Sequence, residues 1–325
     1  MYRLNEGWCL LGTFGASTLG NRTLNHLNPR IRESANPTTQ RDAERRTDRA
    51  RVHTSTKEEK ACIHVQSKKE KEKKKEKKFA ATMEYVSMEG LRVDGRRATE
   101  LRALSADLGV LNGADGSATF SMGQTKVMAA VFGPKEVEQR SLMNPEKAIV
   151  RCEYAMASFS TGERRRRGKS DRRATEISMV IKNALEQTIL LDLMPRTQID
   201  VYIQVLQADG GTRSASINAA FLALADAGIP MRDMVCCCAG GYLDETALLD
   251  MNYVEDSGGG PDVVVGLHPS LDKMVLLQSD NRISLETFEE VVSLVGEGCK
   301  AIGTFMRDVL HKHTSGLAAR LLADE

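Results

Sequence analysis

The clearest candidate for chemistry is a turn at residues 207–213, Gln-Ala-Asp-Gly-Gly-Thr-Arg. Before it, apolar residues recur at every second position from Ile199 to Val205, which predicts a strand. After it, residues 214–227 are rich in Ala, Ser and Leu and are followed by Gly228 and Pro230, which predicts a helix. A strand, a Gly-Gly turn and a helix N-terminus leave several backbone N–H groups unpaired at one point, and such groups attract anions.

The side chains of this turn favour the same chemistry. Thr212 adds a hydroxyl group and Arg213 adds a guanidinium group. Together with Gly210 and Gly211 they predict a site for a phosphate or a carboxylate. The alternative is an ordinary strand-to-helix turn with a surface arginine, because short glycine motifs also occur in such turns.

A second group of cations precedes another predicted helix, in which apolar residues between Ile177 and Leu185 recur at spacings of three and four. Asp171 is a good N-cap residue, which places Arg172 and Arg173 in the first turn. Positive charge there opposes the helix dipole unless an anion lies nearby. We therefore expect this pair to bind an anion, whereas the arginine run 164–167 is also consistent with a solvated loop.

Two acidic residues follow a predicted apolar strand. Asp250 stands at the end of that strand, and Asp256 stands six residues later, before a glycine-rich segment. Two carboxylates near a phosphate site can hold Mg²⁺ through oxygen ligands or act as a general acid. Acidic residues in such loops are also common turn formers, so both interpretations stay open at this point.

Histidine and cysteine usage excludes other kinds of site. The three histidines after residue 82 are His268, His311 and His313, and they support neither a histidine-dependent triad nor a zinc site. The seven cysteines are odd in number and lack zinc spacing, and residues 236–238 are three consecutive cysteines in an apolar run. This pattern predicts buried free thiols in a reducing compartment, the cytosol or the nucleus.

Residues 1–82 differ from the rest of the chain. They carry 19 Lys and Arg against 10 Asp and Glu, whereas residues 83–325 carry 26 against 34. Residues 68–78 are all lysine or glutamate, without an apolar residue. We expect 1–82 to be a disordered basic tail, because it cannot bury enough apolar surface to offset its ordering entropy. A solvated tail, a nucleic-acid-binding arm or nuclear address, and an alternative start at Met83 or Met88 all stay open.

Regular structure is expected in residues 83–325 as one domain. No stretch reaches the roughly 18 apolar residues of a membrane span, and residues 10–20 are too short and too polar for a signal segment. The apolar patterns predict an α/β chain. Strands are expected at 101–110, 117–122, 126–132, 148–159, 199–205, 234–242, 247–252, 263–267 and 273–278, and helices from Asp171, at 214–227 and from Phe288 to about His311. Gly133 and Pro134 are expected to end the third strand.

Four ordered motifs resemble one family. They are Leu-Gln-Ala-Asp-Gly-Gly-Thr-Arg at 206–213, Asp-Ala-Gly-Ile-Pro-Met at 226–231, Phe-Ser-Thr-Gly-Glu-Arg at 159–164, and Asp250 with Asp256. From about Met88 to His313 the chain resembles the ribonuclease PH family, and within it the subunits of the eukaryotic exosome ring. The resemblance implies an α/β (α+β) fold of the βαβ type found in ribosomal-protein S5 domain 2.

The resemblance also implies a reaction, 3′-to-5′ phosphorolysis of RNA, in which inorganic phosphate attacks the terminal phosphodiester. By similarity, the Gly210–Arg213 turn would hold the attacking phosphate, and Asp250 and Asp256 would be catalytic and would bind Mg²⁺. The arginines expected to bind RNA are Arg172, Arg173, Arg151 and Arg140.

The implied setting is a hetero-hexameric ring of paired ribonuclease PH-like subunits that binds RNA, carries S1/KH-type cap subunits and acts in rRNA maturation and mRNA turnover. Its expected location is the nucleus and nucleolus, and also the cytoplasm, without a membrane. Activity is expected only in the assembled ring. The alternative is a catalytically inert subunit that threads RNA, but the presence of Arg213 together with both arginine and aspartate pairs favours the enzyme.

Overall fold

The computed structural model describes residues 85–139, 141, 143–164 and 171–323. All of them lie in one compact unit, Phe79–Glu325. The predicted tail and the boundary proposed at residue 82 fall outside the described residues, and both stay predictions. Within the described part, no helix is long and apolar enough to cross a membrane.

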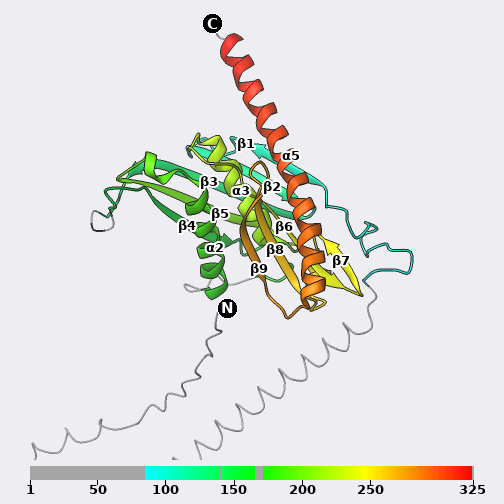
Figure 1. Ribbon diagram of the computed structural model, residues 1–325. Helices are drawn as coiled ribbons and strands as arrows, with labels where there is room; N and C mark the ends of the chain where they lie inside the picture. The colour runs from blue at the N-terminus through cyan, green and yellow to red at the C-terminus, as the bar shows by residue number, and fades with distance from the viewer. Residues whose placement is uncertain (1–84, 140, 142, 165–170, 324–325) are drawn as a thin grey trace, which may run out of the picture. The chain divides into compact units, whose positions relative to one another are not determined.

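The first sheet has five strands in the order β1-β2-β3-β5-β4 (Figure 1). They are β1 (Leu104–Leu108), β2 (Gly116–Met122), β3 (Thr125–Glu136), β4 (Ile149–Met156) and β5 (Thr197–Gln207). Only the pair β4 and β5 is parallel, and α2 (Arg172–Thr188) connects these two strands as a βαβ crossover. The chain order of strands and helices confirms the predicted α/β fold, and each of these strands overlaps a predicted one.

The predicted end of the third strand is wrong. Strand β3 does not end at Gly133 and Pro134 but continues to Glu136. The pairing of β3 with β5 shifts register between Phe132 and Lys135, so the irregularity accommodates a proline that has no N–H group to donate.

The second sheet has four antiparallel strands in the order β7-β6-β8-β9. They are β6 (Cys236–Leu243), β7 (Thr246–Leu249), β8 (Asp262–His268) and β9 (Lys273–Ser279). The three consecutive cysteines begin β6, and all three are buried free thiols, as predicted. Burial raises the pKa of each thiol, to about 12 for Cys236.

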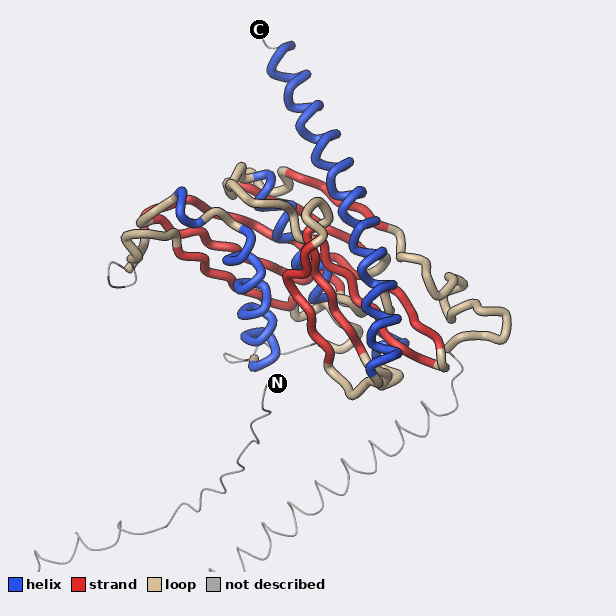
Figure 2. Tube along the Cα trace, viewed as in Figure 1, coloured by secondary structure: helices blue, strands red, loops and turns tan. Residues whose placement is uncertain are grey.

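The helices cover and join the sheets (Figure 2). Helix α3 (Thr212–Asp226) packs against strands of both sheets, and every residue from Ser214 to Leu224 is buried, which explains its richness in small and apolar side chains. Helix α5 (Leu285–Ala323) packs its Val291, Val295, Cys299, Ile302 and Met306 against the second sheet and extends beyond the predicted end near His311. The described residues also form two short elements, η3 (Leu191–Leu193) and α4 (Tyr253–Asp256).

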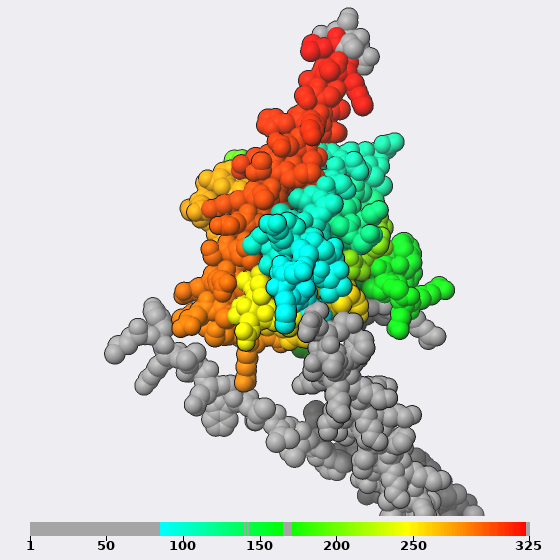
Figure 3. Space-filling model, turned by 90° about the vertical axis from the view of Figure 1, so that its right-hand side faces the viewer, coloured from blue at the N-terminus to red at the C-terminus, as the bar shows by residue number. Residues whose placement is uncertain are grey.

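Residues 85–102 form a strap that precedes the first sheet yet packs against the second. Figure 3 shows this cyan segment lying against the yellow segment around residues 245–255. Tyr85 donates its backbone N–H to Asp244 Oδ2 at 2.8 Å, and the backbone N–H of Leu249 donates to Ala98 O at 2.8 Å. The strap therefore reaches the segment that carries both predicted acidic residues.

Candidate active site

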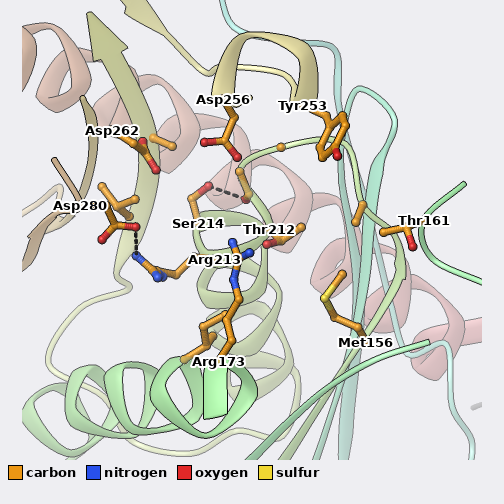
Figure 4. A pocket seen from close by; sticks show the side chains of 16 residues that line it. Met156, Thr161, Arg173, Thr212, Arg213, Ser214, Tyr253, Asp256, Asp262 and Asp280 are labelled. Atoms are coloured by element: carbon orange, nitrogen blue, oxygen red, sulfur yellow. Dashed lines mark hydrogen bonds and ion pairs between the residues drawn. The ribbon is translucent and has the colours of Figure 1, made fainter. Parts of the chain in front are cut away.

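A cavity of about 140 Å³ lies where the turn before α3, the start of α2, helix α4 and the second sheet meet (Figure 4). It collects two arginines, Arg173 and Arg213, and three aspartates, Asp256, Asp262 and Asp280. The remaining lining residues are Met156, Thr161, Ile177, Ala208, Gly210, Gly211, Thr212, Ser214, Ala239, Tyr253 and Val264. The predicted turn and parts of the predicted arginine and aspartate pairs thus come together from distant parts of the chain.

The Gly-Gly turn has a backbone that other residues would adopt only with strain. Gly210 and Gly211 have φ values of 73° and 60°, and Gly211 is the N-cap of α3. A Cβ atom on Gly210 would lie 2.6 Å from the carbonyl carbon of Asn252, so the turn also depends on close backbone packing. No side chain caps the helix at Gly211, which leaves the N–H groups of its first turn available beside the cavity.

Arg213 leaves the first turn of α3 and points into the cavity (Figure 4). Its side chain is only 12% exposed, and its Nη1 lies 3.8 Å from Asp280 Oδ2. The Nε atom is buried without a hydrogen-bond partner among the described residues. A largely buried guanidinium group whose ion-pair partner lies 3.8 Å away, and which has an unused donor, is suited to an anion such as phosphate.

Only one of the two predicted arginines on α2 reaches the cavity. Asp171 caps this helix as predicted, because its Oδ1 accepts from the backbone N–H of Arg173 at 3.2 Å. Arg173 lines the cavity, and Arg172 does not. Successive helical residues point about 100° apart, so the two side chains cannot share this direction.

The carboxyl groups of the cavity are not the pair that the sequence suggested. Asp256 belongs to α4 and lines the cavity as expected, whereas Asp262 begins β8 and Asp280 follows β9. Burial raises the pKa of Asp256, although the nearby guanidinium of Arg173 acts to lower it. Burial, reinforced by the charges of Asp256 and Asp280, raises the pKa of Asp262 to about 7. Asp262 Oδ1 is also buried without a hydrogen-bond partner in the described part of the chain.

Asp250 has a different place from the one predicted. Its side chain is buried and does not line the cavity. Both of its oxygens accept from the Arg102 guanidinium, Oδ1 at 2.7 Å and Oδ2 at 2.9 Å. Asp250 also has a φ of 53°, and this left-handed backbone comes one residue after β7. The sequence spacing gave no indication of this buried ion pair, and the catalytic and metal roles expected of Asp250 stay predictions.

Arg102 joins the two halves of the site. Besides its contacts with Asp250, its Nη1 donates to Asp209 O at 2.5 Å, directly before the Gly-Gly turn. The Thr125 hydroxyl donates to Gly210 O at 2.7 Å and fixes the same turn from β3. One buried guanidinium therefore holds both the turn that carries Arg213 and the segment that leads to Asp256.

A second buried arginine of the strap fixes helix α4. Arg92 donates to both carboxylate oxygens of Glu255, from Nε at 2.7 Å and from Nη2 through a shorter contact. Its Nη1 donates to Leu249 O at 2.6 Å. Asn252 and Glu255 also form a capping box at the start of this helix. Asp256, the next residue, is thus held by neighbours that are themselves paired.

The other arginines expected to bind RNA lie away from the cavity or outside the description. Arg151 is on β4, where it pairs with Glu153 at 2.7 Å and Glu138 at 3.8 Å, and it does not line the cavity. Arg140 lies outside the described residues, as do residues 165–167 of the arginine run. Among the described residues no group of three or more His, Cys, Asp or Glu side chains is arranged to hold a metal ion.

Comparison with known proteins points to one family. The two domain models of the 3′ exoribonuclease family (RNase PH) match residues 100–230 and 233–294. The chain is 59% identical over 242 residues to the exosome complex component RRP41 homolog of Arabidopsis thaliana, covering 74% of this chain and all of that protein. It is 45% identical over 245 residues to exosome complex component RRP41 of Homo sapiens, covering 75% of this chain and all of that protein.

Solved structures agree with the fold. The crystal structure of rice (Oryza sativa) Rrp46 superposes with a TM-score of 0.62 at 28% identity, covering 68% of this chain and all of the rice protein. A chain of the Archaeoglobus fulgidus exosome with RNA bound to the active site superposes with a TM-score of 0.60 at 20% identity, covering 70% of this chain and 96% of the other.

Proposed function

Because the chain belongs to the 3′ exoribonuclease family (RNase PH), we propose that it shortens RNA from its 3′ end by phosphorolysis, as a subunit of an exosome ring. The observation that carries the proposal is the meeting of two guanidinium groups, a helix N-terminus and three carboxyl groups around one cavity. Phosphoryl transfer needs mainly positioning and stabilisation of negative charge, which these groups supply without a covalent nucleophile.

In the proposed reaction an oxygen of inorganic phosphate forms a bond to the phosphorus of the last phosphodiester, and the bond from that phosphorus to the 3′ oxygen breaks. The terminal nucleotide leaves as a nucleoside diphosphate, and the 3′ oxygen of the shortened RNA takes up a proton. Gly211, Thr212 and Arg213 hold the attacking phosphate, and Arg173 holds the phosphodiester. Asp262 can carry the proton near neutral pH, because burial raises its pKa to about 7. Burial raises the pKa of Asp256 as well, which makes it the second candidate for this role.

The cavity also fits Mg²⁺. This ion is usually bound in proteins by one or two carboxylates together with substrate phosphates, so a larger cluster of protein ligands is not required. Whichever of Asp256 and Asp262 does not carry the proton would hold it in its ionised form, and both residues line the cavity. When bound, Mg²⁺ would neutralise charge that develops on the phosphoryl oxygens.

The names of the relatives support a place in a larger assembly. Proteins of the same length as the matched region are named exosome complex components, and one solved neighbour is an exosome with RNA. We propose that this chain pairs with other ribonuclease PH-like subunits in a hetero-hexameric ring, binds RNA and carries S1/KH-type cap subunits. Its location in the nucleus, nucleolus and cytoplasm stays a prediction.

The rival function is an inert ring subunit that only threads RNA. The test is to reconstitute the ring with its paired subunits and to supply RNA, phosphate and Mg²⁺. We expect nucleoside diphosphates as products, lost with Arg213→Glu and kept with the matched charge reversal Arg320→Glu, which lies in the last turn of α5. Nucleoside monophosphates, an absence of mononucleotides, or full activity of Arg213→Glu would contradict the proposal.

A further inference from the structure

A second cavity of about 430 Å³ adjoins the first. It is lined by Thr161, Gly162, Glu163, Arg164, Ala208 and Tyr253. Three of these residues, Thr161, Ala208 and Tyr253, line both cavities. Figure 4 shows Tyr253 and Thr161 on the side of the first cavity away from Asp262 and Asp280. A ligand whose phosphate lies between the arginines can therefore extend directly into the second cavity.

Tyr253 combines a fixed backbone with an exposed ring. Its N–H donates to Asp209 Oδ1 at 3.3 Å, and its carbonyl oxygen accepts from the Ser257 hydroxyl at 2.6 Å. The residue is nevertheless 61% exposed, and neither of the two ring pairs found in the described part of the chain includes it. An aromatic ring held in this way can stack on a flat ligand at little entropic cost.

The polar groups of the second cavity differ from those of the first. Glu163 and Arg164 bring one negative and one positive charge, so this cavity lacks the paired arginines that favour phosphate. The Thr161 hydroxyl already donates to Glu163 O at 2.8 Å, which leaves its oxygen free to accept a hydrogen bond. A neutral, flat group with donors and acceptors at its edge fits these features, and nucleobases have this chemistry.

We propose that the second cavity is a nucleobase subsite, in which Tyr253 stacks on the base of one of the two nucleotides joined by the scissile phosphodiester. This inference rests on the proposed function, because that function places the phosphodiester beside Arg173. Every base offers a π face, so stacking holds the 3′ end of an RNA without fixing its sequence. The subsite would thus keep the last phosphodiester in place for each successive cleavage.

The first experiment measures base stacking in the reconstituted ring without phosphate, so that no RNA is consumed. The probes are RNAs with 2-aminopurine as the last or the penultimate base. We expect the wild-type ring to quench the fluorescence of one of them, and Tyr253→Phe to do the same. Tyr253→Ala should abolish the quenching and weaken RNA binding about five- to hundredfold. Leu321→Ala, which removes a similarly exposed side chain near the end of α5, should change neither.

The second experiment uses RNAs with an abasic residue at the last or the penultimate position. On the RNA that lacks the stacked base, Tyr253→Ala should bind as well as the wild type. The subsite would be overturned if Tyr253→Ala lost the same affinity, relative to the wild type, for both abasic RNAs. It would also be overturned if Tyr253→Ala bound intact RNA as tightly as the wild type.

The two proposals fail in different ways. If the wild-type ring releases no nucleoside diphosphates, the proposed reaction is wrong, while the quenching without phosphate still reports on the subsite. If nucleoside diphosphates appear and Tyr253→Ala behaves as the wild type in both experiments, only the subsite is wrong.

Discussion

Replacement of Arg102 by methionine should damage both the stability and the activity of the protein. The Arg102 guanidinium donates to both carboxylate oxygens of Asp250 and to Asp209 O, and its side chain is only 6% exposed. Of the hydrogen bonds that residue 102 donates to the buried Asp250 carboxylate, methionine would keep only the one from its backbone N–H, at 3.0 Å. Removal of one partner of a buried ion pair typically costs about 3–5 kcal/mol, so we expect a loss of that size in the free energy of unfolding.

The double variant Arg102→Met/Asp250→Leu separates stability from positioning. It removes both buried charges, so it should recover most of the lost free energy of unfolding. It should not recover the rate of phosphorolysis, because the carbonyl of Asp209 still lacks the donor that holds the turn before Arg213. Arg102→Lys should keep part of the activity, since an ammonium group can contact one side of the carboxylate but not both.

Urea unfolding of the isolated subunit gives the free energies, and nucleoside diphosphate release by the reconstituted ring gives the rates. The matched control is Lys300→Met, which breaks an exposed ion pair with Asp272 of 2.9 Å and should leave the free energy of unfolding nearly unchanged. A cost below about 1 kcal/mol for Arg102→Met would refute the stability argument. A double variant that is both stable and fully active would refute the positioning argument.

Two further predictions concern single residues of the cavity. Burial raises the pKa of Asp262 from its ordinary value of 3.8 to about 7 in the folded protein, so this carboxyl reduces stability as the pH rises from about 4 to 7. Asp262→Asn should therefore raise the melting temperature, measured with EDTA present, more at pH 8 than at pH 5; equal gains would contradict this. Gly210→Ala should lower both stability and phosphorolysis, because its Cβ would meet the backbone of Asn252 at 2.6 Å. Gly228→Ala has a similar φ of 69° with nothing within 4 Å and should cost only about 1 kcal/mol in urea unfolding, so equal effects of the two would exclude the packing argument.

The turn before α3 could be predicted from the sequence because all of its signals are local. The alternation in β5, the two glycines and the helix that follows stand within one short stretch, which places Arg213 in the first turn of α3. The same holds for Asp171 and the first turn of α2, which placed Arg173 correctly. Secondary structure was predictable for the same reason, apart from the irregular end of β3, the early end of β7, the short helix α4 and the length of α5.

The acidic residues of the cavity could not be predicted in the same way, because they come together only when separate strands pair. Asp262 and Asp280 are single carboxylates at the ends of neighbouring strands, and the N–H of Asp280 donates to Asp262 O at 3.1 Å. The sequence predicts both strands, with an acidic residue directly before the first and shortly after the second. It does not give the order of the strands in the sheet, so it could not show that these two residues are neighbours. The pairing of Asp250 with Arg102 could not be predicted, because spacing does not report side-chain direction. The direction here depends on a left-handed φ and on an arginine 148 residues earlier.

The positive and negative side chains of the cavity come from different parts of the chain, and this affects how a relative could lose its activity. Both arginines belong to the first matched family domain, residues 100–230, and all three aspartates to the second, residues 233–294. The groups proposed to bind substrate therefore also attract each other across the junction of the two domains, as Arg213 and Asp280 do at 3.8 Å. Loss of one set alone would leave like charges facing each other at that junction. Inactive relatives should accordingly have replaced arginines and aspartates together, which keeps the junction neutral.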